Sequence, residues 1–384
     1  MKLDRTMVAV GAALALAACA DQSPVSGRAP EAAPLLQASA GSIEGSYIVV
    51  VNEGADPRSV AAVAGVSPRY VYTAALNGFA AELNQGQLNA LRHNPNVEYV
   101  EEDGVAEASV TQSGATWGID RIDQRNRPLS GTYTYTTTAS NVYAYVIDTG
   151  IYTSHSNFGG RASNVYDAFG GSGADCNGHG THVAGTIGSA TYGVAKGVRL
   201  RGVRVLDCNG SGSWSGIIAG IDWVRLNRTN PAVANLSLGG GLNSSVNTAV
   251  TNLANSGVFV AVAAGNSNAN ACNYSPASAS VVTTVASSTS SDAKSSFSNY
   301  GSCVDVYAPG SSILSTYNNG GTATLSGTSM ASPHVAGVAA LYKAGNTGAS
   351  QATVDSWIKT NSTANVITGN PSGTPNRLLY KAAL

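Results

Sequence analysis

The chain has 384 residues, of which 43% are hydrophobic and only 11% are charged. This composition supports a sizeable core and excludes disorder over most of the length. The formal net charge of −1 favours neither a nucleic-acid partner nor a broadly basic membrane-binding surface. The length predicts two or three domains.

The first 19 residues predict an export signal rather than a folded element. A basic start precedes an apolar run over residues 7–18, which is too short for a stable membrane-spanning helix. The run ends in Leu-Ala-Ala-Cys, which resembles a bacterial lipobox in which Cys19 would be lipidated and become the new N-terminus. An ordinary cleavage site beside a chance cysteine is the alternative. Residues 20–45 are rich in Pro, Ala and Ser and predict a linker.

The four remaining cysteines predict two disulfides, because an exported chain meets an oxidising environment and the number is even. Three connectivities are possible. Each bridge would close a loop of about 32 residues and contribute roughly 3 kcal/mol in the chain-entropy model. A metal site is the alternative, but no pair has the CxxC spacing of zinc sites. Sequence order favours the pairs Cys176–Cys208 and Cys272–Cys303.

Residues 46–103 predict a small α+β unit. An apolar β-rich run at 46–51 is followed by a helical pattern at 56–65, with an aspartate N-cap and a proline in the first turn. Two extended runs, a second helix and a final strand complete the order βαββαβ, which is typical of a ferredoxin-like unit. The following stretch to residue 109 is acidic and then rich in small residues, as expected of a peptide lying along a cleft. A polar linker is the alternative.

From about residue 110 onward, near-continuous apolar strands alternate with helical stretches. Strands that are apolar throughout belong to a parallel sheet with helices on both faces, so an α/β fold is predicted. In such folds the active site lies beyond the carboxyl ends of the strands. The strands are predicted at 141–148, 198–206, 232–238 and 257–265, and the helices at 180–190, 212–227 and 243–257.

Polar side chains occur at these strand ends and helix starts. A serine hydroxyl needs a base to take its proton, and His179, between two glycines, is a candidate base for Ser329 at the start of a helical stretch. Asp148 ends a buried strand, where an unpaired carboxylate would be costly, and it would hold the imidazole in one tautomer. Asn266 and the backbone N–H of Ser329 are two donors for a developing oxyanion.

The order Asp, His, Ser along the chain separates this set from other serine hydrolases. It is the order of subtilisin, whereas an α/β-hydrolase places its serine first. The only histidine after Ser329 is His334, in the same predicted helix, and "GTSMA" lacks the GxSxG elbow. His182 has a metal-like spacing from His179, but the sequence contains no HExxH motif. His182 is therefore predicted to be a structural helix histidine, and so is His334. The other two histidines, His93 and His155, are predicted at the surface.

These motifs resemble the subtilisin-like serine proteases, and specifically their proteinase K and aqualysin branch. The stretches are "VIDTG", "NGHGTHVAGT", "LSLGGG", "AAGN" and "GTSMASPHVAG" and, for the branch, "TWGIDRIDQR", "RVLDCNGSGS" and "ANACNYSPAS". The resemblance implies a mostly parallel α/β fold and a secreted, monomeric endopeptidase that cleaves polypeptides. It also implies a propeptide that assists folding, inhibits, and is removed autocatalytically. The expected parts are a signal peptide at 1–19, a linker at 20–45, a propeptide at 46–109 and a protease domain at 110–384.

The resemblance assigns roles to particular residues. Asp148, His179 and Ser329 take the triad positions and Asn266 takes the oxyanion position. Because the matching cleft walls are mostly glycine backbone and lack an acidic residue, broad specificity for apolar and aromatic side chains is expected. The family's four-cysteine pattern supports the disulfide pairing above. Gly210, Ser211 and Gly212 match the edge strand that pairs with substrate, and Ser237, Leu238, Gly239 and Gly240 match a wall of the pocket before the scissile bond.

A catalytically silent binding protein on the same fold is the alternative function. The presence of all four catalytic positions argues against it. Aligning "VTQSGATWG" with the mature start of aqualysin-like enzymes places the propeptide cut near Ser109–Val110.

The resemblance also implies structural calcium, and it implies no catalytic cofactor. Asp305 falls at the family's strong calcium position, where the carbonyl oxygens of Ser280 and Val282 would add to an oxygen shell. A surface carboxylate is the alternative. A second calcium site is indicated by Asp120, Asp123 and Gln124.

Overall fold

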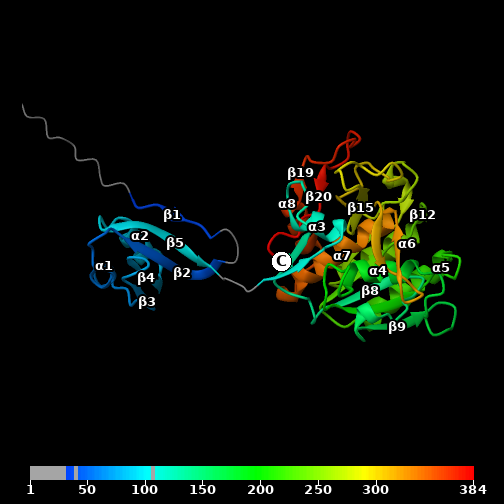
Figure 1. Ribbon diagram of the computed structural model, residues 1–384, viewed down its shortest axis with the longest axis horizontal. Helices are drawn as coiled ribbons and strands as arrows, with labels where there is room; N and C mark the ends of the chain where they lie inside the picture. The colour runs from blue at the N-terminus through cyan, green and yellow to red at the C-terminus, as the bar shows by residue number, and fades with distance from the viewer. Residues whose placement is uncertain (1–31, 39–41, 105–108) are drawn as a thin grey trace, which may run out of the picture. The chain divides into compact units, whose positions relative to one another are not determined.

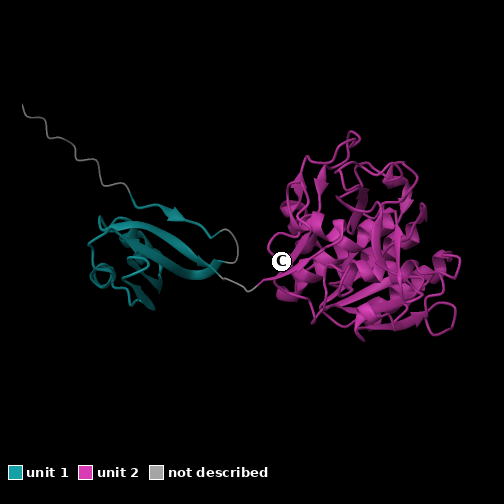
Figure 2. Ribbon diagram, viewed as in Figure 1, with its two compact units in different colours: residues 1–107 teal, residues 108–384 magenta. Residues whose placement is uncertain are grey.

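A computed structural model of the chain describes residues 32–38, 42–104 and 109–384. The chain forms two compact units, residues 1–107 and 108–384 (Figure 2). The predicted export signal, both alternatives for Cys19 and most of the predicted linker lie outside the described residues. In the part of the chain that is described, no helix is both long and apolar enough to cross a membrane.

The first unit is a five-stranded sheet in the order β1-β5-β2-β4-β3, covered by two helices (Figure 1). Val60 and Leu91 of the helices are buried in one cluster with Phe79 of the sheet. The predicted order βαββαβ is therefore found. Its elements are β2 (Ser42–Val51), α1 (Pro57–Val63), β3 (Tyr70–Tyr72), β4 (Gly78–Glu82), α2 (Gln85–Arg92) and β5 (Val97–Gly104).

The linker prediction for residues 20–45 is wrong in its last part. β1 (Leu35–Leu36) pairs in parallel with β5, and Ala33 before it is buried. β2 begins at Ser42, earlier than the predicted strand. The physical reason is that the outer edge of β5 offers unpaired N–H and C=O groups, which a short apolar segment satisfies.

The second unit is built on a nine-stranded sheet in the order β19-β20-β16-β15-β13-β11-β8-β10-β9. All neighbouring pairs are parallel except β19 with β20. The predicted parallel α/β fold is therefore confirmed. The strands are β8 (Tyr143–Asp148), β9 (Ala162–Asp167), β10 (Arg199–Arg204), β11 (Ala232–Leu236), β13 (Phe259–Ala263), β15 (Thr283–Ser288), β16 (Val306–Pro309), β19 (Thr363–Ala364) and β20 (Arg377–Leu378).

Helices cover both faces of this sheet. Each strand packs against both layers, because its successive residues point to opposite faces. In β8, Ala144 and Val146 belong to the core cluster shared with α4 and α7, whereas Tyr145 and Ile147 belong to the cluster shared with α5 and α6 (Figure 1). The helices are α3 (Trp117–Asp123), α4 (His179–Gly188), α5 (Trp214–Asn227), α6 (Ser244–Asn255), α7 (Thr328–Gly345) and α8 (Gln351–Asn361).

Two disulfides hold loops of the second unit. Cys176 is bonded to Cys208 and Cys272 to Cys303, with Cα–Cα distances of 5.0 and 5.3 Å. Both distances lie in the ordinary range for disulfides. This is the pairing that sequence order favoured.

Candidate active site

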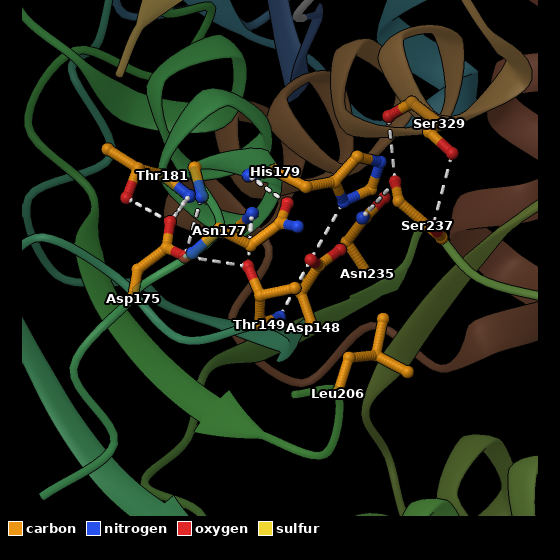
Figure 3. Close-up of polar contacts among 12 residues, drawn as sticks. Asp148, Thr149, Asp175, Asn177, His179, Thr181, Leu206, Asn235, Ser237 and Ser329 are labelled. Carbon is orange, nitrogen blue, oxygen red and sulfur yellow. Dashed lines mark hydrogen bonds and ion pairs between the residues drawn. The ribbon is translucent and has the colours of Figure 1, made fainter. Parts of the chain in front are cut away.

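An aspartate and a histidine are paired at the carboxyl end of β8. Asp148 is the last residue of that strand and is fully buried, and His179 is the first residue of α4. Asp148 Oδ1 lies 2.8 Å from His179 Nδ1 and also accepts from the N–H of Thr149 at 2.7 Å. Because the carboxylate can only accept, Nδ1 carries the proton and Nε2 is left as an acceptor (Figure 3).

The surroundings of His179 favour its protonated form. Burial lowers the pKa of this imidazole, but the charges of Asp148 and Asp175 and the hydrogen bond to Asp148 outweigh burial and raise the pKa above 6.5. The side chain remains 27% exposed. His179 therefore gains a proton readily and still faces the space from which a substrate would approach.

A serine faces the same imidazole from the opposite side. Ser329 is the second residue of α7, and Figure 3 shows the His179 ring between Asp148 and Ser329. Ser329 Oγ donates to the carbonyl of Ser237 at 3.1 Å, and Ser237 Oγ donates to the carbonyl of Ser329 at 2.8 Å. Hydrogen bonds between nucleophile and base are often long before substrate binds, so this rotamer is compatible with a nucleophilic serine.

Asn266 presents an N–H donor beside Ser329. Its Oδ1 accepts from the backbone N–H of Thr328 at 2.8 Å and from the Thr328 hydroxyl at 2.9 Å. The backbone N–H can only donate, so the atom facing it is the amide oxygen. The Nδ2 group of Asn266 is then free to donate into a cavity of about 250 Å³ that Asn266 and Ser329 both line.

The cleft beside this pair has two adjoining parts, of about 680 and 250 Å³. All seven predicted wall residues line it. Sequence reasoning missed Trp214 at the start of α5, whose ring packs so close to Gly240 that an added Cβ there would lie 2.8 Å from it. It also missed Leu206, Ile217, Ala263, Ala264 and Tyr274, which line the cleft as well and make parts of it apolar.

The carboxylate predicted to bind calcium is paired with a lysine. Asp305 Oδ1 lies 2.7 Å from Lys359 Nζ, and its Oδ2 accepts from the N–H of Thr284 at 2.8 Å. Lys359 Nζ also lies 2.7 Å from Asp355 Oδ2. Val282 directly precedes β15 and is buried. An ammonium therefore lies against the Asp305 carboxylate, and calcium at this position stays a prediction.

The second predicted calcium group is also engaged by other partners. Asp120 accepts from Ser130 and Gly131, and Asp123 forms an ion pair with Lys381 at 2.9 Å. Gln124 donates to two carbonyls of its own loop. Among the residues described, no group of three or more His, Cys, Asp or Glu side chains is arranged to hold a metal ion.

The two helix histidines have the structural role predicted for them. His182 and His334 are both buried, and burial lowers the pKa of each to about 4. His182 Nε2 faces the carbonyls of Ile313 and Ala323, and His334 Nδ1 faces the carbonyl of Met330.

Comparison with known proteins identifies the family. A sequence profile of the Subtilase family matches residues 139–378, and one of the peptidase inhibitor I9 family matches residues 46–109. The chain is 50% identical to an extracellular serine proteinase of Thermus sp. (strain Rt41A), over 96% of each chain. It is 49% identical to proteinase R of Parengyodontium album, over 81% of this chain and 82% of that one.

A solved structure agrees. The crystal structure of a cold adapted subtilisin-like serine proteinase superimposes with a TM-score of 0.70 at 53% identity, covering 71% of this chain and all of that one. The profile match spans more than half of the chain, and the relatives match nearly all of it or most of it. The chain is therefore a serine protease that belongs to the Subtilase family.

Proposed function

We propose that Asp148, His179 and Ser329 are the catalytic triad of a secreted endopeptidase that cleaves polypeptides through an acyl-enzyme. The observation that carries this proposal is the 2.8 Å contact between buried Asp148 and His179, with Ser329 on the other side of the imidazole. This contact directs Nε2 of His179 toward the serine. Asp148 also stabilises the imidazolium that forms during the reaction, because its buried carboxylate carries the opposite charge.

The reaction then proceeds in two halves. Ser329 Oγ attacks the scissile carbonyl carbon while His179 Nε2 takes the hydroxyl proton. The C–N bond breaks as the imidazolium gives this proton to the leaving amine, and the acyl group stays on Ser329. In the second half a water molecule attacks the ester carbonyl carbon while the same imidazole takes a proton from it. The bond between this carbon and Ser329 Oγ then breaks, the imidazolium returns the proton to Oγ, and the acid is released.

Two N–H donors meet the negative charge that develops on the carbonyl oxygen. One is Asn266 Nδ2, which the two hydrogen bonds from Thr328 orient. The other is the backbone N–H of Ser329 in the first turn of α7. Fixed donors of this kind stabilise the transition state more than the substrate, because the charge is largest in the transition state.

Replacing Asn266 by alanine is expected to reduce kcat about 10²–10³-fold with a much smaller change in KM, the usual loss of one oxyanion donor. Steady-state kinetics on a peptide substrate measure this effect. Asn252→Ala, which removes an exposed asparagine of α6, is the matched control and should retain wild-type kinetics. Equal kcat values for Asn266→Ala and wild type would exclude Asn266 from the oxyanion site.

The walls of the cleft support broad specificity. The smaller cavity contains Ala263, Ala264 and glycine backbone, and no charged side chain lines it. A charged side chain would lose its hydration there without gaining a partner, so apolar and aromatic side chains before the scissile bond are favoured. Gly210, Ser211 and Gly212 line the larger cavity and offer main-chain groups to an extended substrate.

Covalent labelling tests the proposed function directly. A sulfonyl fluoride reagent that reacts with activated serines should label Ser329 of the mature protein, as peptide mass spectrometry would show. Ser329→Ala should not be labelled, and Ser326→Ala, three residues earlier, should react as wild type does. If Ser329 in the folded protein stays unlabelled, the chain is a silent binding protein on this fold.

Export and maturation complete the proposal. The I9 match at residues 46–109 supports a propeptide that acts as an intramolecular inhibitor, and one relative is named extracellular. We place the cut near Ser109–Val110, where residue 110 begins β6 (Val110–Ser113). Mass spectrometry of the native protein would reveal this cut and would distinguish a lipid on Cys19 from ordinary signal cleavage.

At the position expected for calcium, we infer that the ammonium of Lys359 provides the positive charge. Asp305 and Asp355 share this ammonium, and Asp355 Oδ1 also accepts from the Thr283 hydroxyl at 2.7 Å. These contacts tie α8 to β15. A calcium ion at Asp305 would have to displace a lysine that is already paired twice.

A chelator is therefore expected to leave the melting temperature of the wild type unchanged. Lys359→Met should lower it by roughly 2–4 °C, for a loss of about 1 kcal/mol from a partly exposed ion-pair network. In Lys359→Met, added calcium should raise the melting temperature again, because the Asp305 and Asp355 carboxylates are left without a cation. Differential scanning calorimetry measures both effects. A chelator-sensitive wild type that loses this sensitivity in Asp305→Asn would instead establish calcium at Asp305.

A further inference from the structure

A second buried carboxylate lies beside the catalytic histidine. Asp175 precedes α4 by four residues and is only 7% exposed. It does not touch the imidazole, and the reaction proposed above assigns it no role. Figure 3 shows its carboxylate within a ring of donors that includes Thr149, Asn177 and Thr181.

Both oxygens of Asp175 are fully engaged. Oδ1 accepts from the Thr149 hydroxyl at 2.9 Å and from the N–H groups of Asn177 at 2.9 Å and Gly178 at 2.8 Å. Oδ2 accepts from the N–H of Thr181 at 3.0 Å and from its hydroxyl at 2.5 Å. Five hydrogen-bond donors therefore converge on this one buried carboxylate.

These bonds take over the capping of α4. The N-cap residue, Gly178, has no side chain and a φ of 108°, so it offers no capping group. The N–H of Thr181 is instead satisfied by Asp175, and the N–H of Gly180 by the Thr149 hydroxyl at 2.9 Å. Without these acceptors the first turn, which carries His179, would have unpaired N–H groups in a buried position.

Thr149 connects the two carboxylates. Its N–H donates to Asp148 Oδ1 at 2.7 Å, and its hydroxyl donates to Asp175 Oδ1. The end of β8, which carries Asp148, and the start of α4, which carries His179, are thus joined through one threonine. A displacement of about 1 Å between catalytic groups can cost on the order of 10²-fold in rate. The contacts of Thr149 therefore affect catalysis, because they fix the position of His179 relative to Asp148.

We propose that Asp175 is a positioning residue for His179: it holds the start of α4 against the Asp148 strand and adds a second fixed negative charge near the imidazole. The proposal rests on the triad assignment above. It differs from a purely structural cap because the carboxylate charge also acts on the protonation of His179.

Two carboxylates are the charged groups that act on the pKa of His179. Asp148 from β8 and Asp175 from the segment before α4 both raise its pKa, whereas His182 on α4 itself is neutral above a pH of about 4. β17 (Ile313–Thr316) and the first turn of α7, which also pack near α4, carry no titratable side chain. The arginines of the neighbouring strand β10 pair elsewhere: Arg204 with Asp167, and Arg199 and Arg201 with the ring of Tyr143.

Asp175→Asn tests the proposal, since it keeps the side chain's shape and removes its charge. We expect kcat to fall roughly 10- to 100-fold with KM little changed, because the imidazole is misplaced. We also expect the acid limb of the kcat/KM profile to move to lower pH, because the imidazolium loses a stabilising anion while catalysis needs the neutral base. Active-site titration gives the concentration of active enzyme, so that misfolded protein does not lower the values of kcat and kcat/KM.

Thr181→Val is the matched control, because it removes a hydroxyl from the same carboxylate but leaves the charge. Its acid limb should coincide with that of wild type. If Asp175→Asn fails to fold, Thr149→Val, which cuts the link between the carboxylates, should still show a lower kcat. A wild-type acid limb in Asp175→Asn, or a wild-type kcat in Thr149→Val, would overturn the proposal. Labelling of Ser329 in the wild type decides the proposed function separately.

Discussion

Replacing Ser329 by alanine is expected to abolish nearly all proteolysis while leaving the fold intact. The substitution removes one hydroxyl that donates only to the Ser237 carbonyl, and the residue is small. Without the nucleophile the acyl-enzyme cannot form. The expected loss in kcat is roughly 10⁶-fold, the scale found when the serine of subtilisin, a member of the same family, is removed. Peptide hydrolysis and a thermal melt measure activity and fold on one sample.

The same variant should also fail to mature. If the chain cuts itself, Ser329→Ala keeps residues 46–109 attached, and mass spectrometry of the purified protein would detect the uncut chain. Ser326→Ala, which removes a hydroxyl outside the cleft, should mature normally. A processed Ser329→Ala protein, made in a host without other proteases, would contradict autocatalytic removal.

Asp148→Asn should cause the second largest loss, on the order of 10⁴-fold in kcat. The amide would offer an N–H group to Nδ1 of His179, which favours the tautomer with the proton on Nε2. In that tautomer His179 cannot accept the proton of Ser329. Because Asp148 is fully buried, water cannot replace the lost carboxylate. The kcat/KM profile against pH measures the loss and shows whether the remaining activity depends on an imidazole.

Asp167→Asn is a matched control for this substitution. Asp167 ends β9 and pairs with Arg204 at 3.3 Å, so the change removes a mostly buried carboxylate away from the triad. It should reduce stability more than kcat. A value of kcat for Asp148→Asn within tenfold of wild type would rule out Asp148 as the partner of the base.

The position of the candidate site was predictable from local patterns. Strands such as Tyr143–Asp148 and Phe259–Ala263 are apolar throughout because both of their faces are covered, and this feature is visible in the sequence. Parallel strands bring their carboxyl ends to one edge of the sheet. Asp148 ends one such strand and Asn266 follows another, so their place at the same edge of the sheet follows from the fold class alone.

Other features were not visible in local patterns. His155 was predicted at the surface, but it is 3% exposed and its Nε2 lies 2.8 Å from the carbonyl of Gly321, far along the chain. Leu35–Leu36 was predicted in a linker, but it forms a strand with β5. In both cases the partner is distant in sequence, and no periodicity points to it.

The sequence alone determined the type of each main element, the family and the four residues at the centre of the site. These depend on spacing and residue type, which the chain carries locally. The tertiary structure decided which buried charges are paired and by what. A buried carboxylate needs a partner, but any of several donors satisfies it. Only the fold shows that Asp305 meets Lys359, and that Asp175 meets Thr149 and the start of α4.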